Sequence, residues 1–194
     1  MKITLIILIL LFSSSVFADD ISDYQIEGIS VGDSLLDYLS KEKILSEINR
    51  NEKLYSWIGE QKFGEVYWYK KFNTYDYLSF FVKPNDENFL IYGIFGSFIE
   101  EEINSCYKSQ NKIGNEISNI FNNLKRDKGT YILGGDPSGK SKATYLNFKF
   151  NNGDRIEITC YDYDQSVQTE VYALDGLDVA QIKSELHMWL FPRD

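Results

Sequence analysis

The sequence contains one histidine and two cysteines, which leaves little material for side-chain catalysis or metal binding. Structural zinc sites take four protein ligands, mostly cysteine and histidine, and His187, Cys106 and Cys160 are too few to supply that set. The sequence has no histidine-based triad, no G-x-S-x-G motif and no dinucleotide-binding fingerprint. We therefore predict no catalytic residue, no cofactor and no metal ion.

Positive charge is also scarce, because 20 lysines and arginines are set against 29 aspartates and glutamates. The formal net charge is -9, and the sequence pI is about 4.7. Non-specific binding to nucleic acid or to anionic lipid needs a basic surface, so both are poor candidates for partners. Hydrophobic residues make up 43% and charged residues 25% of the 194 residues, which is typical of one globular domain.

The N-terminus has the pattern of a signal peptide. Lys2 precedes an apolar run from Ile3 to Phe12, and three serines and Val16-Phe17-Ala18 follow. Small residues at the -3 and -1 positions predict cleavage after Ala18. An uncleaved membrane anchor is the alternative, but this apolar run is much shorter than the roughly 20 residues that a spanning helix needs. We expect export to a periplasm or to the medium, and a single α+β domain over residues 19–194.

The two cysteines are predicted to form a disulfide, because an exported protein meets an oxidising environment. Cys106 lies on the apolar stripe of an amphipathic helix expected over 99–126. Cys160 alternates with polar residues in a strand expected over 155–163. Both sulfurs should therefore meet where this helix packs on the sheet. Free buried thiols are one alternative. A nucleophilic cysteine is another, but neither cysteine has basic neighbours arranged to activate it.

The remaining pattern predicts an α+β fold, an antiparallel sheet with helices packed on one face. Further helices are expected over 34–39, 41–50 and 178–190. Strands are expected over 63–72, 75–83, 88–98, 145–150 and 168–174, where aromatic and β-branched residues are frequent. Asn151-Asn152-Gly153-Asp154 is a hairpin turn signal between the strands that flank it.

Residues 134–141 match the phosphate-binding pattern G-x-x-x-x-G-K-[ST], with Gly134, Gly139, Lys140 and Ser141 at its defined positions. Such a loop binds phosphate through backbone amides at the start of a helix. Here the alternation of residues 145–150 predicts a strand instead of a helix. We therefore interpret the segment as a polar hairpin loop and not as a nucleotide site.

Four tyrosines fall at alternating positions of two neighbouring predicted strands, namely Tyr67, Tyr69, Tyr75 and Tyr77. If they share the outer face of the sheet, they form an aromatic platform that can stack against sugars or peptides. Cross-strand tyrosine pairs that only stabilise the sheet are the alternative interpretation.

Several segments have a familiar pattern: Ile26-Glu27-Gly28-Ile29-Ser30-Val31-Gly32-Asp33-Ser34, Glu101 to Tyr107, Ser138 to Ser141 and Ile158 to Asp162. Together they resemble an uncharacterised family of small secreted proteins from marine bacteria. The resemblance implies export and brings no activity or catalytic residue. The opening segment is also similar to lipoprotein components of outer-membrane assembly and to β-lactamase-inhibitor-like domains, which implies a protein-binding role by analogy.

The leading hypothesis is a non-enzymatic exported domain that binds another molecule, such as an envelope or secreted protein. A hydrolase that uses carboxylates is one alternative, because such an enzyme needs no signature spacing. A glycan or peptide binder that uses the tyrosine-rich face is another.

The mature protein is expected to start at Asp19 and to contain the disulfide. Intact mass spectrometry of unreduced protein from the exported fraction should give the mass of residues 19–194, two hydrogens lighter than the dithiol form. A chain that retains residues 1–18, or one that labels two thiols with an alkylating agent after unfolding, would contradict this.

Overall fold

The computed structural model describes residues 20–54, 63–100, 102–134, 136–164 and 184–191, with the backbone alone at 52–54 and 184–191. The main helices are α1 (Lys41–Leu54) and α2 (Ile103–Ile120), with short 3-10 turns at Ile21–Asp23 and Leu35–Asp37. The strands are β1 (Gln25–Ile26), β2 (Ile29–Ser30), β3 (Gly64–Trp68), β4 (Tyr77–Val82), β5 (Ile91–Glu100), β6 (Lys125–Ile132), β7 (Lys142–Lys149), β8 (Arg155–Asp162) and β9 (Ser184–Phe191).

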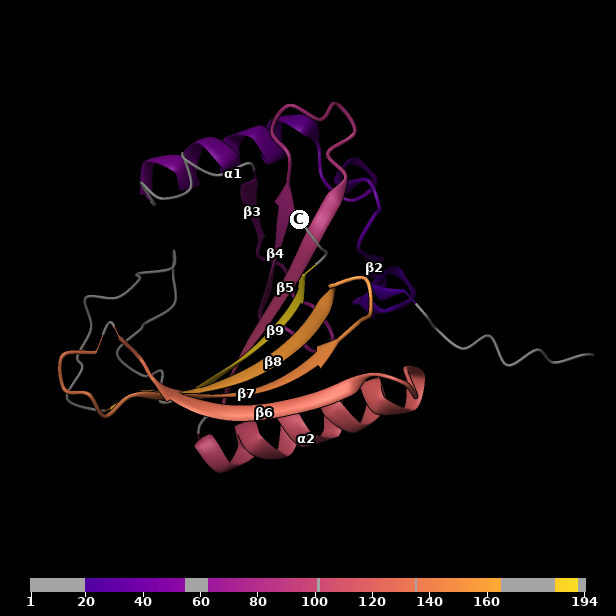
Figure 1. Cartoon of the computed structure of the whole chain (residues 1–194). Coiled ribbons are helices and arrows are strands. Elements are labelled where there is room, and N and C mark those ends of the chain that lie inside the picture. The colour runs from indigo at the N-terminus through magenta and orange to yellow at the C-terminus, as the bar shows by residue number, and fades with distance from the viewer. Residues whose placement is uncertain (1–19, 55–62, 101, 135, 165–183, 192–194) are drawn as a thin grey trace, which may run out of the picture.

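One seven-stranded sheet contains strands from both halves of the chain, in the order β3-β4-β5-β9-β8-β7-β6. Every neighbouring pair is antiparallel. The C-terminal strand β9 lies in the middle and joins the meander β3-β4-β5 to the meander β6-β7-β8 (Figure 1). The α+β class predicted from the sequence is confirmed.

The hydrophobic core lies on one face of this sheet, called here the inner face. Side chains alternate between faces along a strand, and residues paired across strands share a face. Val66, Phe80 and Ile94 are paired in this way, and all are buried. Leu146 and Ile158 continue the inner face on the other side of β9. The helices and the small β1-β2 hairpin pack against these residues.

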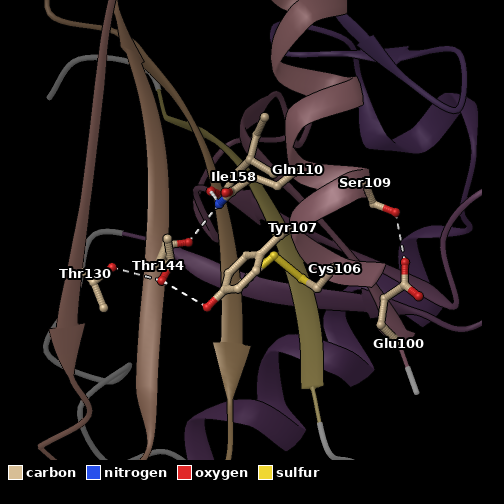
Figure 2. Close-up of a disulfide and its surroundings, with 9 residues drawn as sticks. Glu100, Cys106, Tyr107, Ser109, Gln110, Thr130, Thr144 and Ile158 are labelled. Carbon is tan, nitrogen blue, oxygen red and sulfur yellow. Dashed lines mark hydrogen bonds between the residues drawn. A yellow bond between two sulfur atoms is a disulfide. The ribbon is translucent and has the colours of Figure 1, made fainter. Parts of the chain in front are cut away.

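Helix α2 is attached to the inner face at successive turns by three different contacts, of which Figure 2 shows the disulfide and the Gln110 hydrogen bonds. Cys106 forms the predicted disulfide with Cys160 of β8. One turn later Gln110, fully buried, donates its Nε2 to the carbonyl oxygens of Thr144 at 2.7 Å and Ile158 at 2.8 Å. At Gly114 the helix backbone comes so close that an added Cβ would collide with the Leu146 side chain.

Helix α1 packs on the inner face at the β3 edge of the sheet. Ile44 and Ile48 are buried in the core, and Ile48 lies directly over Gly64 of β3. Asn51 donates its Nδ2 to the carbonyl oxygen of Glu65 at 2.6 Å. Since β3 is an edge strand, this bond satisfies a carbonyl that no strand pairs with, among the residues the structure describes.

The expected helix boundaries were wrong at both ends of α2. The helix starts at Ile103 and not at Ile99, because β5 continues to Glu100 and pairs there with β9. It ends at Ile120, and residues 125–132, partly assigned to the helix from the sequence, form strand β6. β6 has no apolar alternation because it is an edge strand with exposed side chains, so hydrophobic periodicity could not reveal it.

The helix expected over 178–190 was wrong for residues 184–190, which belong to strand β9. Leu186, Trp189 and Leu190 fit helical spacing, but Leu186, Met188 and Leu190 also alternate as in a strand. Hydrogen-bonded neighbours on both sides settle the ambiguity in favour of the strand. Residues 34–39 form only a short 3-10 turn. The expected strand over 168–174, like the signal peptide over 1–18, lies outside the described residues.

Among the described residues, no helix is long and apolar enough to cross a membrane.

Removing the disulfide should cost a large part of the stability. The bond links residues 54 positions apart. In the chain-entropy model, closing a loop of that size raises the free energy of the unfolded chain by about 4 kcal/mol. We expect the Cys106→Ala/Cys160→Ala variant to lose about 3–4 kcal/mol of unfolding free energy in urea denaturation. A loss below about 1 kcal/mol would show that α2 is held mainly by its other contacts.

Candidate functional site

The face of the sheet that points away from the helices, called here the outer face, carries at least seven tyrosines among the residues that the structure describes. Tyr67, Ser79 and Phe95 are paired across β3, β4 and β5, one position along from the inner-face residues. Thr159 of β8 and Tyr145 of β7 continue the outer face beyond β9. We define the tyrosine face by the outer-face tyrosines Tyr67, Tyr69, Tyr77, Tyr131, Tyr145, Tyr161 and Tyr163.

The first cluster of this face brings three of the four singled-out tyrosines together. The rings of Tyr67 and Tyr69 are nearly parallel, with centroids 6.0 Å apart. Tyr77 contacts both, at 5.9 Å from Tyr67 and 5.5 Å from Tyr69. Tyr77 is buried and also packs on Phe95, whereas 38% of Tyr69 is exposed. Tyr69 is therefore the member of this cluster that a ligand can reach most easily.

Tyr75 does not belong to this cluster, contrary to the expected set of four. Its ring lies on the inner face, over Gly96 and 5.9 Å from the ring of Phe98. Tyr75 precedes β4, so strand alternation does not govern its direction. The Glu27 carboxylate accepts hydrogen bonds from the amides of Asn73 and Thr74 and holds this loop towards the β1-β2 hairpin.

The second cluster of the tyrosine face was missed from the sequence. Tyr131 of β6 and Tyr161 of β8 flank the small Ala143 of β7 and hydrogen-bond to each other. Burial raises the pKa of the Tyr161 hydroxyl, and the contact with Tyr131 adds to the effect. The ring centroids of Tyr145 and Tyr131 lie 6.4 Å apart, and Tyr163 stacks on Tyr161 with ring centroids 6.0 Å apart. With 45% of its surface exposed, Tyr131 is the accessible member here.

A glycine opens the space for this second cluster. Gly129 of β6 is paired with Tyr145 of β7, and a Cβ at Gly129 would lie 2.5 Å from the Tyr145 hydroxyl oxygen. The Tyr145 ring therefore covers the glycine backbone on the edge strand. The pairing could have been found from the sequence only if β6 had been identified.

Polar groups lie between the tyrosines on the same face. Glu65 is only 5% exposed. Its carboxylate accepts a hydrogen bond from the Ser79 hydroxyl at 2.8 Å and is also hydrogen-bonded to the Tyr67 side chain. Burial raises the pKa of the Glu65 carboxyl, and these two hydrogen bonds oppose the effect only in part. On β8, Thr159 donates to Glu157 at 3.1 Å.

The loop that matches the phosphate-binding pattern is filled by one of its own carboxylates. Asp136 accepts hydrogen bonds from the backbone amides of Ser138, Lys140 and Ser141, and from the Ser138 hydroxyl. These amides occupy the positions from which a phosphate loop would bind its ligand. Burial alone would raise the pKa of Asp136, but the hydrogen bonds from Ser141 and Ser138 outweigh it and hold the pKa well below its usual range.

The other residues of the pattern also have local partners. The Lys140 ammonium lies 3.7 Å from the Asp164 carboxylate, and the Ser141 hydroxyl accepts the Asp164 amide at 2.9 Å. Strand β7 begins at Lys142, where a nucleotide-binding loop would begin a helix. Gly134, Gly139, Lys140 and Ser141 thus belong to the hairpin connection between β6 and β7.

No group of three or more histidine, cysteine or acidic side chains is arranged to hold a metal ion in the part of the chain that the structure describes.

Asp136→Asn should loosen the loop without changing the sheet, because an amide cannot accept at its nitrogen. We expect the amides of Ser138, Lys140 and Ser141 to exchange about tenfold faster with deuterium. The pKa of Asp136 is lower in the folded than in the unfolded protein, so the carboxylate stabilises the folded state at pH values above its unfolded pKa. This contribution is lost as the pH falls below about 4. Equal exchange in both proteins at neutral pH would contradict this role.

Glu65→Gln should increase stability at neutral pH. The pKa of this carboxyl is higher in the folded than in the unfolded protein, so its protonated form stabilises the folded state at pH values below the unfolded pKa of about 4.5. This contribution to stability is lost as the pH rises through the folded-state pKa. The variant removes the buried charge, so its gain in urea denaturation should appear at pH 7 and vanish near pH 3, where both side chains are neutral. A gain that does not change with pH would have another origin.

No family model matches the chain, and no curated protein or solved structure matches it either. The candidate site therefore rests on the chemistry and position of the residues described above.

Proposed function

We propose that this protein is a non-enzymatic exported binding domain and that its tyrosine face holds a neutral carbohydrate chain. The observation that carries the proposal is the gathering of seven tyrosines on the sheet face opposite the helices. The helices pack on the inner face, and on the outer face Tyr69 and Tyr131 are 38% and 45% exposed, so these two rings can meet a ligand there.

The side chains of this face have the chemistry that sugars require. A tyrosine ring offers a flat apolar surface to the C–H face of a sugar ring, and its hydroxyl can hydrogen-bond to sugar hydroxyls. Between the rings, the partly exposed Glu157 adds a carboxylate, whereas Ser79 and Thr159 are fully buried and donate to Glu65 and Glu157. The net charge of -9 favours a neutral over an anionic chain.

The spacing of the two clusters favours a polymer over a small molecule. Tyr69 follows β3 at one edge of the sheet, and Tyr131 lies on β6 at the other. Six strand spacings of about 4.8 Å give about 29 Å along the sheet. Only an extended ligand would contact Tyr69 and Tyr131 together.

Binding is favoured over hydrolysis at Glu65, the described acid of this face whose pKa is raised. A carboxylate glycosidase needs two carboxyl groups within about 10 Å of each other. Glu65 has the raised pKa of a general acid, but Glu157, on the same face, lies four strands away, about 19 Å along the sheet.

Export is supported by the N-terminal pattern of residues 1–18 and by the disulfide. Disulfides persist in a periplasm or outside the cell and are rare in a reducing cytosol.

The exposed member of each cluster provides the test. Isothermal titration with cellohexaose, chitohexaose, laminarihexaose, maltohexaose and xylohexaose should identify at least one ligand. Tyr69→Ala and Tyr131→Ala should each weaken its binding about tenfold, because each removes one stacking contact.

Ile132→Ala is the matched control. Ile132 is the neighbour of Tyr131 on β6, is 60% exposed and belongs to the opposite face by alternation, so its loss should leave carbohydrate binding unchanged. The proposal is wrong if no oligosaccharide binds, or if Ile132→Ala weakens binding as much as Tyr131→Ala does.

A further inference from the structure

The two edge strands of the sheet, β3 and β6, differ in how their outward backbone groups are covered. At the β3 edge, α1 packs against the strand, and the Asn51 side chain donates a hydrogen bond to the Glu65 carbonyl. At the other edge, β6 pairs with β7 along its whole length, and no described strand pairs with its second side. All residues of β6 except Gly129 are exposed. In Figure 1, β6 runs along the outside of the sheet with α2 beneath it.

The hydrogen-bond pattern identifies which backbone groups of β6 point outward. Leu133 donates its amide to the carbonyl of Ser141 at 3.0 Å, which makes this pair a hydrogen-bonded position of the β6-β7 ladder. In an antiparallel ladder the bonded positions recur every second residue. Residues 125, 127, 129 and 131 therefore bond to β7, and the amides and carbonyls of Arg126, Lys128, Thr130 and Ile132 face outward.

The side chains of β6 limit which strand can pair with these groups. In a protein with net charge -9, β6 carries Lys125, Arg126 and Lys128 against a single acid, Asp127. Lysine on an edge strand opposes pairing between copies of a protein, because like charges on neighbouring strands repel. The same charges attract an acidic strand. Beyond them, Ile132 offers an apolar side chain that is 60% exposed.

We propose that β6 is the docking edge for an extended acidic segment of a partner protein, which adds an eighth strand to the sheet. Backbone hydrogen bonds to residues 126, 128, 130 and 132 would hold such a segment, as in other cases of strand addition. Two acidic residues, separated by one position, pair with Arg126 and Lys128. An apolar residue four positions before the acid that pairs with Lys128 lies beside Ile132. This proposal is independent of the tyrosine face.

A synthetic peptide tests the edge directly on the disulfide-bonded mature chain. The probe Val-Thr-Val-Thr-Glu-Thr-Glu-Thr carries this pattern in the antiparallel direction, and a counterpart with lysine for both glutamates is its control. With a fluorescent label and anisotropy detection, the acidic peptide should bind at least about tenfold more tightly than the lysine peptide. The difference should shrink between about 50 mM and about 500 mM salt.

Two variants of Thr130 separate the backbone contact from the side chain. Thr130→Pro removes one outward amide and leaves the bonds to β7 intact, so it should weaken binding about fivefold to tenfold. Thr130→Val loses the same hydroxyl contact with Thr144 but keeps the amide, and should bind like the original protein. Lys128→Glu, which does not depend on proline being tolerated, should reverse the preference between the two peptides.

The proposal is overturned if neither peptide binds, if both bind equally, or if Thr130→Pro binds as well as Thr130→Val. It is also overturned if analytical ultracentrifugation shows that the protein alone dimerises and that Lys128→Glu abolishes this, because β6 would then pair with a second copy.

Discussion

The attachment of α2 to the sheet is the constraint on which the rest of the structure depends. A disulfide, two hydrogen bonds from one buried glutamine and a glycine contact act at Cys106, Gln110 and Gly114, one helical turn apart. They fix α2 against β7 and β8, whose other face carries Tyr145 and Tyr161 of the second tyrosine cluster. Because one face of these strands is closed by the helix, the face that remains for a ligand is the one with the tyrosines.

The acidic character of the chain has a structural role in its turns. Asp136 binds the amides of its own loop, and Glu27 binds those of Asn73 and Thr74. Asp33 accepts from the Ser30 amide and the Tyr38 hydroxyl, and Asp86 accepts from two amides that follow it. A carboxylate that binds backbone amides at a turn takes the place that an external anion would need. This explains how a segment can match a phosphate-binding pattern and still be an ordinary hairpin loop.

The sequence was sufficient for features that depend on local periodicity or on a strong chemical preference. Cys106 and Cys160 could be paired because a helical stripe and a strand alternation each placed one sulfur at the same interface. The strand after Ser141 could be identified because Leu146 and Phe148 alternate with polar residues. These patterns arise from burial on one side of an element, which the sequence records directly.

The remaining features depend on long-range contacts. β6 is exposed along the edge and so carries no burial pattern, and its absence from the prediction concealed Gly129, Tyr131 and the second tyrosine cluster. Tyr75 was placed on the wrong face because Glu27, distant in sequence, redirects its loop. Gln110 is a polar residue on an otherwise apolar helical stripe, and only the carbonyls of two neighbouring strands explain it.

The ring resonances of the tyrosines test most directly whether the two faces of the sheet have different roles. Ring resonances of carbon-13-labelled tyrosine should be followed while the best-binding hexasaccharide is added. We predict shifts at Tyr69, Tyr131 and their cluster neighbours, with Tyr24, Tyr75 and Tyr107 on the helix side unchanged. Shifts confined to Tyr24, Tyr75 and Tyr107, or absent from both exposed tyrosines at saturation, would contradict this prediction.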